Sequence, residues 1–218
     1  MSETPIGRRP PGATRKTRSD GERSRQAILR EAAQLATVEG LGGLSIGRLA
    51  DAVGMSKSGL FAHFGSKQEL QLATIETASA LFTEQVVEPA AAAPTAIGRL
   101  RLLADGYLRH IEARVYPGGC FFASLIAETD AQSGPIRDWA VDFMSRWMAA
   151  LEEMVAAAQA EGAIDAAEDP GQLAFEVESY LLLANAQFVI SQDSTPIERA
   201  RAALQRRLAL AGAAAAAA

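Results

Sequence analysis

Residues Leu44–Lys67 read LSIGRLADAVGMSKSGLFAHFGSK and carry the strongest structural signal in the chain. Ser45 and Ser56 each precede a short run with apolar residues at helical spacing, where a hydroxyl can cap the first turn. Gly54 ends the first run, because glycine tolerates the left-handed backbone that such a turn needs. Ala50 is small, so a second helix can approach closely there. The stretch therefore predicts a helix-turn-helix.

The two predicted helices have a buried side and an exposed side. Apolar residues would hold the pair against a preceding helix; they are Ile46, Leu49, Val53, Leu60 and Phe64. Small and polar residues of the second helix face outward; they are Ser56, Lys57, Ser58, Gly59 and His63. The major groove of DNA admits one α-helix, and side chains of this kind can reach base edges there. We therefore expect the second helix to contact DNA.

Helical signals flank this motif on both sides. A first helix is predicted from Asp20, with apolar residues at helical spacing up to the glycine-rich stretch Gly40–Gly43 that ends it. Ser66 and Glu69 have the spacing of a capping box, so a fourth helix begins there and runs toward Pro89. The motif is thus expected to sit inside a small helical unit.

The rest of the chain has the same helical character. Apolar residues recur at helical spacing between Pro and Gly breaks, and no segment alternates with period two like a strand. The chain is predicted to be all-α, with about nine helices. We expect a disordered basic tail over 1–19, a helix-turn-helix domain over 20–67, a second helical domain over 68–212 and a low-complexity alanine tail over 213–218.

Composition excludes several classes of protein. Of the 218 residues, 49% are hydrophobic, which is typical of a folded chain rather than a disordered one. The single cysteine, Cys120, excludes a disulfide-stapled fold, and one Cys with two His cannot supply a usual zinc site. The polar N-terminus indicates no signal peptide, and the apolar run Tyr180–Ile190 is too short to span a bilayer. We expect a cytoplasmic protein that does not enter a membrane and holds no metal or cofactor.

Charge is unevenly placed along the chain. Residues 1–70 contain 11 Lys and Arg against 7 Asp and Glu, whereas residues 71–218 contain 10 against 19. A basic N-terminal segment (residues 1–70) followed by an acidic segment (residues 71–218) suggests that the N-terminal segment binds a polyanion. Two interpretations of Arg15, Lys16 and Arg18 stay open: an arm that reaches a DNA minor groove, or a solvated tail.

With Ile28–Ala33 and Gly40 placed before it, the stretch Leu44–Lys67 resembles the TetR family of bacterial transcriptional regulators. The resemblance covers about Arg23 to Leu72 and ends in the pattern His-Phe-x-x-Lys. It implies an all-helical body that dimerises and carries a small-molecule pocket. Gly118–Phe122 and Gly134–Asp138 resemble one subgroup of such bodies.

The resemblance also suggests which residues contact DNA. The family usually has a tyrosine where this chain has Phe61, so one phosphate hydrogen bond is lost. Lys57 and Ser58 are expected at base edges, with a phosphate contact for Lys57 as the alternative, and Lys67 at a phosphate. His63 could donate to a phosphate or pack between helices. The full expected set is Ser45, Ser56, Lys57, Ser58, Gly59, Phe61, His63 and Lys67.

An effector pocket of the family type would be lined by aromatic and polar residues of the middle helices. The expected set is Tyr107, His110, Cys120, Phe121, Phe143, Trp147 and Tyr180. The same aromatic spacing is also typical of a plain core, and an inert buried thiol is the simpler interpretation of Cys120. A Cys120–His110 dyad is conceivable only if the turn at Pro117 folds the two together. The two C-terminal helices are broad and apolar, which favours a homodimer interface.

The helix-turn-helix pattern and the basic N-terminal part predict a sequence-specific DNA-binding regulator, and the TetR resemblance implies that it is dimeric and responds to a small effector. We expect it to repress and to leave a near-palindromic operator when the effector binds. No phosphate-binding glycine loop, His-x-x-x-His pair or nucleophile elbow is found, so we expect no enzyme and no catalytic residues. The alternative is a helical small-molecule-binding protein or enzyme with a vestigial DNA-binding motif.

Overall fold

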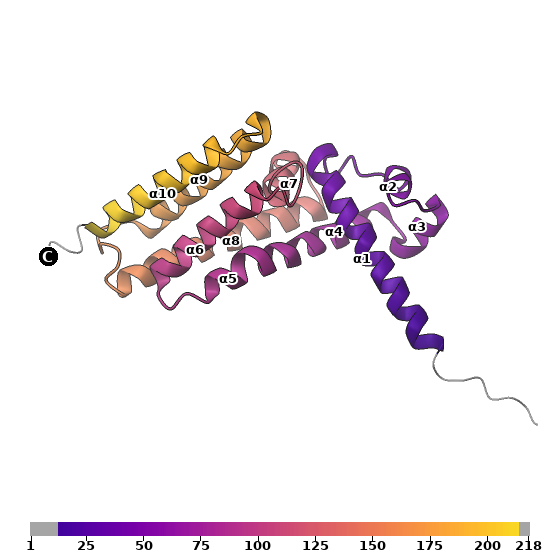
Figure 1. Cartoon of the computed structure of the whole chain (residues 1–218), viewed down its shortest axis with the longest axis horizontal. Helices are drawn as coiled ribbons and strands as arrows, with labels where there is room; N and C mark the ends of the chain where they lie inside the picture. Colours follow the sequence, from indigo (N-terminus) through magenta and orange to yellow (C-terminus); the bar gives the residue numbers. More distant parts are fainter. Residues whose placement is uncertain (1–12, 214–218) are drawn as a thin grey trace, which may run out of the picture.

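The computed structural model describes the backbone of residues 13–213 and the side chains of residues 21–212. Every regular element in this range is helical (Figure 1). The elements are α1 (Ala13–Glu39), α2 (Ile46–Ala52), α3 (Lys57–Phe64), α4 (Lys67–Phe82), the π-helical turn η1 (Thr83–Val87), α5 (Glu88–Ala91), α6 (Ala96–Glu112), α7 (Phe121–Thr129), α8 (Pro135–Ala160), α9 (Pro170–Ser191) and α10 (Thr195–Ala213). Because α4, η1 and α5 are continuous, residues 13–213 form nine helical rods, and the all-α prediction is confirmed.

The N-terminal unit consists of α1 to α3 packed on the start of α4. Its core is formed by residues that share one face of α1 together with the inner faces of α2 and α3; they are Ile28, Leu29, Ala32, Ala33, Leu49, Ala50, Leu60 and Phe64. Gly54 and Gly65 have φ of +65° and +69°, the left-handed backbone that lets the chain reverse after each short helix. The predicted helix-turn-helix is confirmed.

Helix α1 begins at Ala13, ahead of the expected start at Asp20. The last proline before it is Pro11, so nothing between 13 and 20 prevents helical hydrogen bonding. The expected tail over 1–19 is therefore wrong for the backbone from residue 13 onward. Residues 1–12, the side chains of the proposed basic arm and the alanine tail beyond residue 213 lie outside the described residues.

The long rod from Lys67 to Ala91 passes through a proline without breaking. Pro89 has no N–H to donate to the preceding turn. The wider π-helical turn Thr83–Val87 directly before it absorbs the mismatch, since a π turn adds one residue to the helical repeat. The rod runs from the N-terminal unit into the body as one continuous helical segment (Figure 1).

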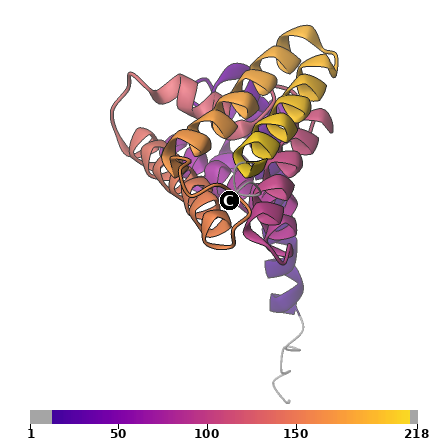
Figure 2. The same ribbon diagram turned by 90° about the vertical axis from the view of Figure 1, so that its left-hand side faces the viewer.

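The body is a bundle built around α6, which packs against α8, α9, α10 and the η1–α5 part of the long rod. Figure 2 shows these helices gathered about a common core. In the described part of the chain, α9 is the one helix long and apolar enough to cross a membrane. Here it serves as a core helix, with one face packed against α8 and α10.

Helix α7 and the loop before it connect the body to the N-terminal unit. The Gln34 side-chain amide donates to the Val115 carbonyl at 2.8 Å, and the Gly118 N–H donates to Thr37 Oγ1 at 3.2 Å. A side chain at Gly118 would place its Cβ 1.8 Å from the Thr37 carbonyl oxygen, so only glycine fits this approach. The two units therefore share a close-packed junction.

Candidate nucleic-acid interface and buried cavity

Three serines start the helices of the N-terminal unit. Ser45, Ser56 and Ser66 have extended backbone, and each hydroxyl accepts from the N–H three residues later, at 3.1–3.2 Å. Each cap satisfies one N–H that the first turn leaves unpaired. Ser45 and Ser56, predicted to contact DNA, thus also fix where α2 and α3 begin.

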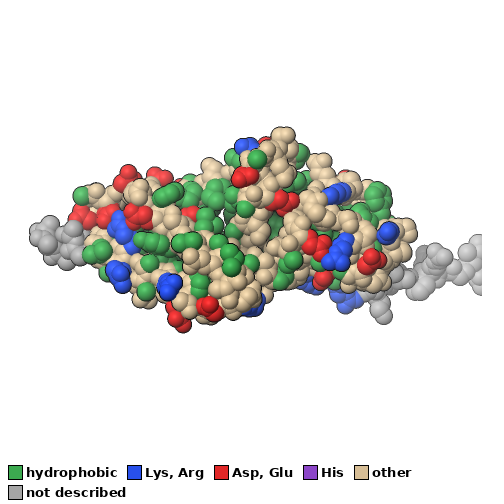
Figure 3. All heavy atoms as spheres, turned by 90° about the horizontal axis from the view of Figure 1, so that it is seen from above, with side chains coloured by type: hydrophobic (Ala, Val, Ile, Leu, Met, Phe, Trp, Pro, Cys, Tyr) green, Lys and Arg blue, Asp and Glu red, His purple; other side chains and the backbone are tan. Residues whose placement is uncertain are grey.

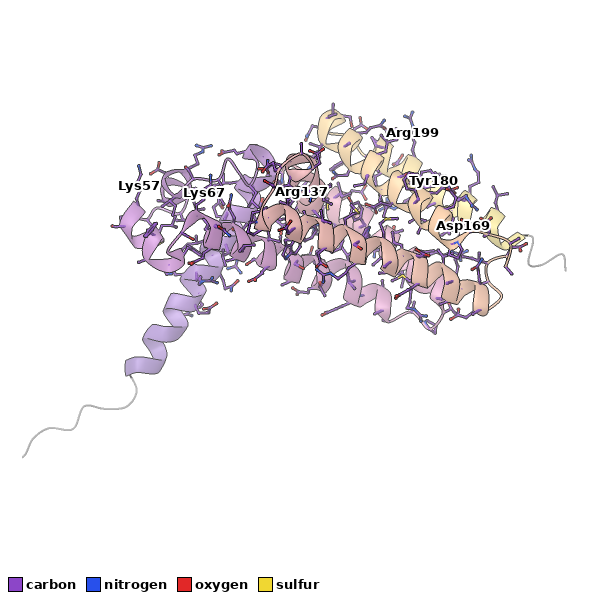
Figure 4. All side chains as sticks on the ribbon, turned by 180° about the vertical axis from the view of Figure 1, so that it is seen from behind. Lys57, Lys67, Arg137, Asp169, Tyr180 and Arg199 are labelled. Atoms are coloured by element: carbon purple, nitrogen blue, oxygen red, sulfur yellow. The ribbon has the colours of Figure 1, made fainter. Side chains whose placement is uncertain are left out.

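Helix α3 presents one face to solvent. Lys57, Ser58, Phe61 and Ala62 are exposed, whereas Leu60 is buried in the core. Figure 4 shows Lys57 at the outer end of the N-terminal unit. These four residues form an exposed strip along α3, the helix that we expected to contact DNA.

Two details of this face depend on neighbouring residues. The Lys57 stem crosses Gly47 of α2, where a Cβ would lie 3.1 Å from Lys57 Cε, so Gly47 leaves room for the side chain. The Phe61 ring is 51% exposed although it is apolar. A phenyl ring can contact a thymine methyl group but cannot donate to a phosphate. His63 and Gly59 are half-buried at the edge of the strip.

Lys67 already has a protein partner. Its ammonium donates to the Gly42 carbonyl at 2.6 Å, across the turn between α1 and α2. The Glu128 carboxylate of α7 accepts from the Leu41 N–H at 2.6 Å and the Gly42 N–H at 2.5 Å, and the Gln71 amide donates to the Leu41 carbonyl. Lys67 therefore helps to hold this turn, and its expected phosphate contact stays a prediction.

Two arginines of the N-terminal unit lie outside the expected set of DNA-contacting residues. Arg48 on α2 is exposed and pairs with Glu39, which raises the pKa of Arg48 and lowers that of Glu39 through their hydrogen bond. Arg25 on α1 lies over the Phe64 ring, 5.1 Å from its centroid. Arg48 stands in the quoted motif, three residues after Ser45, and that position was the available signal.

The body contains a buried cavity between α6, α7, α8 and α9. Its free volume is about 10 Å³, close to the size of one water. The lining residues are Phe82, Tyr107, Cys120, Phe122, Ala123, Ile126, Phe143, Met144, Trp147, Glu178 and Leu182. The structure thus brings together Tyr107, Cys120, Phe143 and Trp147 of the expected pocket.

Aromatic rings form most of the cavity wall. Phe82 lies at the centre, with edge contacts to Tyr107, Phe122 and Trp147 at centroid distances of 5.5–6.2 Å. Phe122 and Phe143 stack at 4.0 Å. Offset and edge-on arrangements of this kind are the preferred geometries of aromatic pairs, so the wall is well packed.

The polar groups in this wall are few and unusual. Trp147 Nε1 donates to the Glu178 carboxylate at 2.7 Å, and burial raises the pKa of Glu178 to about 7. The Tyr107 hydroxyl is the one buried side-chain N or O atom among residues 21–212 without a hydrogen-bond partner. Burial, then the neighbouring Cys120 and Glu178, raise the pKa of Tyr107. Burial also raises the pKa of the Cys120 thiol, so the thiolate that a redox sensor needs is disfavoured.

Three expected pocket residues do not line this cavity. His110 points toward η1, where its Nδ1 lies 2.9 Å from Gln85 Oε1, and burial lowers its pKa to about 4. Phe121 packs instead against Tyr116, because the adjacent Phe122 takes the inward position on α7. Tyr180 stands two residues after Glu178 on α9, so the helical repeat turns its side chain to another side of the helix, where it is half-buried. No hydrogen bond joins His110 to Cys120 in the described residues, so the dyad is not formed.

Seven of the eleven lining residues were not in the expected set: Phe82, Phe122, Ala123, Ile126, Met144, Glu178 and Leu182. The signal for Glu178 was its place in the buried stripe of α9, between Val177 and Leu181. Among residues 21–212, no group of three or more His, Cys, Asp or Glu could hold a metal ion.

Comparisons with known proteins agree with this arrangement. Residues 28–74 match the family described as "Bacterial regulatory proteins, tetR family", and residues 96–204 match "Tetracyclin repressor-like, C-terminal domain". The fold and the exposed helix define a helix-turn-helix DNA-binding regulator with a helical ligand-binding body. The chain belongs to the TetR family of transcriptional regulators.

Individual relatives are distant. The transcriptional regulator AcuR of Cereibacter sphaeroides is 26% identical over 179 residues, which cover 80% of this chain and 78% of AcuR. A TetR transcriptional regulator from Chloroflexus aurantiacus J-10-fl is 25% identical with a TM-score of 0.78, over 85% of this chain and 94% of that one. AibR, solved in complex with isovaleryl coenzyme A and operator DNA, is 24% identical with a TM-score of 0.67, over 86% and 97%. The structural similarity to AibR supports the fold of this chain.

Proposed function

We propose that this regulator is a homodimeric repressor, that it binds a near-palindromic operator through α3, and that a small effector in the body releases it. The observation that carries the proposal is the exposed strip Lys57–Ala62, held by the buried Leu60 and capped by Ser56. A capped, well-packed helix is rigid enough to lie in a major groove. Lys57 and Ser58 are proposed to meet base edges, and Ser45 and His63 the backbone.

An unpartnered apolar face supports the dimer. Phe175, Leu183 and Ile190 of α9 and Leu210 of α10 are each more than half exposed. Figure 3 shows hydrophobic side chains open to solvent over the half of the molecule that the C-terminal helices form. Joining two such faces would remove apolar surface from water. A dimer that reads a near-palindromic operator must hold its two α3 helices about 34–36 Å apart on one side of the duplex.

Helix α7 supplies a physical route between effector and DNA. Its residues Phe122, Ala123 and Ile126 line the cavity. Near its other end, Glu128 accepts from two N–H groups of the turn that precedes α2. A guest that widens the cavity would shift α7 and with it this turn. The effector can lower DNA affinity only as far as it binds more tightly to the arrangement with α7 shifted than to the arrangement that binds DNA.

The test is a gel-shift titration on DNA upstream of the gene's own locus, in parallel with shuffled DNA at two salt concentrations. We expect salt-sensitive binding that prefers the upstream fragment. Equal affinity for both fragments would overturn the proposal and favour the alternative, a helical ligand-binding protein with a vestigial DNA-binding motif.

A further inference from the structure

The buried cavity contains a carboxyl group with no cationic partner. Glu178 is 7% exposed, and its one hydrogen bond is from Trp147 Nε1 to Oε2. A buried carboxyl is costly unless something pairs with it, and a glutamine could accept from Trp147 equally well. The Trp147 contact therefore does not explain why an ionisable carboxyl, rather than an amide, occupies this position.

The surroundings of Glu178 favour positive charge in a guest. Phe82, Tyr107, Phe122, Phe143 and Trp147 turn aromatic surface toward the cavity. Aromatic faces carry negative potential and attract organic cations, most strongly when water is excluded.

The same surroundings disfavour a negative guest. The lining contains no Lys, Arg or His. The nearby His110 contacts the Phe82 ring, with 5.8 Å between the ring centroids, and its Nδ1 lies 2.9 Å from Gln85 Oε1. An anion would meet the Glu178 carboxylate with nothing in the lining to neutralise either charge. The unpartnered Tyr107 hydroxyl, 3% exposed, remains available to accept from or donate to a polar head group.

We propose that the cavity takes a small organic cation, a protonated alkylamine whose ammonium group donates to Glu178 and lies against the faces of Tyr107 and Trp147. This inference rests on the proposed function, because it assigns the chemical class of the effector. The alkyl tail would lie against Ile126, Met144 and Leu182.

The geometry also indicates where the ligand enters. An apolar groove of about 460 Å³ opens between α7, α8 and α9. It shares Ala123, Ile126, Met144 and Leu182 with the buried cavity, so these four side chains form the wall between the two spaces. Met144 is unbranched and adaptable, so it can move aside. Since the closed cavity has room for about one water, binding must widen it, and this widening is the event that α7 transmits.

The experiment compares three probes of equal size and different charge: butylammonium, butanol and butyrate. Binding to the full chain at pH 8 is followed by calorimetry and by tryptophan fluorescence, since both tryptophans, Trp139 and Trp147, belong to the aromatic cluster. We expect saturable binding of butylammonium, at least about tenfold tighter than of the other two. Equal or tighter binding of butanol or butyrate, or no binding by any probe, overturns the inference.

The variant Glu178→Gln keeps an acceptor for Trp147 but removes the charge. We expect it to lose the preference for butylammonium, by about tenfold or more, while its circular dichroism stays that of a folded helical protein. The matched control, Glu153→Gln, removes an exposed carboxylate of α8 and should bind like the original chain. Unchanged butylammonium affinity in folded Glu178→Gln also overturns the inference.

A DNA arm separates this inference from the proposed function. Butylammonium is added to the complex with upstream DNA. Selective DNA binding without any ammonium binding leaves the regulator proposal standing and removes the ligand class. Binding of butylammonium without selective DNA binding keeps the ligand class and overturns the regulator proposal.

Discussion

At the residue scale, Glu178 links the cavity to the stability of the fold. Burial raises its pKa from an ordinary value near 4.5 to about 7. Between these two pH values the Glu178 carboxyl is protonated in the folded state but ionised in the unfolded chain. Stability contributed by this group is therefore full below pH 4.5 and falls as pH rises toward 7, by about 3 kcal/mol at most. Burial of His110 has the opposite sign, since its lowered pKa of about 4 costs stability as pH falls below 6.5.

The first prediction is that Glu178→Gln unfolds at higher urea concentration than the original chain at pH 8. The difference should shrink toward pH 4.5, where both side chains are uncharged. Urea unfolding at four or five pH values measures it. A difference that does not change with pH would mean that the Glu178 carboxyl carries no desolvation penalty.

The second prediction contrasts two lysines of the N-terminal unit. Lys57 lies exposed at the start of α3, whereas Lys67 holds the Gly42 carbonyl. Lys57→Ala should relax the choice of base at one operator position, with a cost of about 1–3 kcal/mol there. Lys67→Ala should weaken binding about equally on operator and shuffled DNA. Titrations against single-base operator variants distinguish them, and a loss confined to one base in Lys67→Ala would contradict its assignment.

At the scale of elements, α7 is short but touches both units. Cys120 precedes its first turn and its N–H donates to Asn185 of α9 at 2.8 Å, while Glu128 near the other end holds the turn at Leu41. A helix anchored at both ends moves as one body. If the body and the N-terminal unit are coupled, we expect α7 to transmit movement from one to the other.

The third prediction follows from these anchors. Glu128→Ala removes the acceptor of two N–H groups and should reduce effector-induced release from DNA more than it reduces effector binding. The ratio of DNA affinities with and without effector is the quantity to measure. Asp130→Ala, an exposed acid beside α7, is the control and should leave that ratio unchanged. Full response in Glu128→Ala would exclude this route.

At the scale of the whole molecule, the apolar face of α9 predicts the oligomeric state. Phe175→Asp with Leu183→Asp places two charges on it and should convert a dimer to a monomer in sedimentation experiments. Val38→Asp alters an equally exposed apolar residue of α1 and should leave the mass unchanged. We expect the monomer to bind a palindromic operator at least about tenfold more weakly. A wild-type chain that sediments as a monomer would remove this surface as the interface.

Sequence alone determined the helices of this protein and the presence of a helix-turn-helix. Caps such as Ser56 and reversals such as Gly54 act within a few residues, so their effect is readable from local spacing. The family follows from the same stretch. The early start of α1 was missed because residues 13–19 contain no apolar residues at helical spacing, although Arg and Lys are good helix formers.

Only the tertiary structure decided which side chains share the cavity and which hold the units together. Glu178 meets Trp147, and Glu128 meets Leu41, across 31 and 87 residues of chain. The choice of Phe122 over Phe121, and of Glu178 over Tyr180, depends on the rotation of one helix against others. The helical spacing of apolar residues identifies the buried face of a helix. Only packing against neighbouring helices determines which residue of that face points into the cavity.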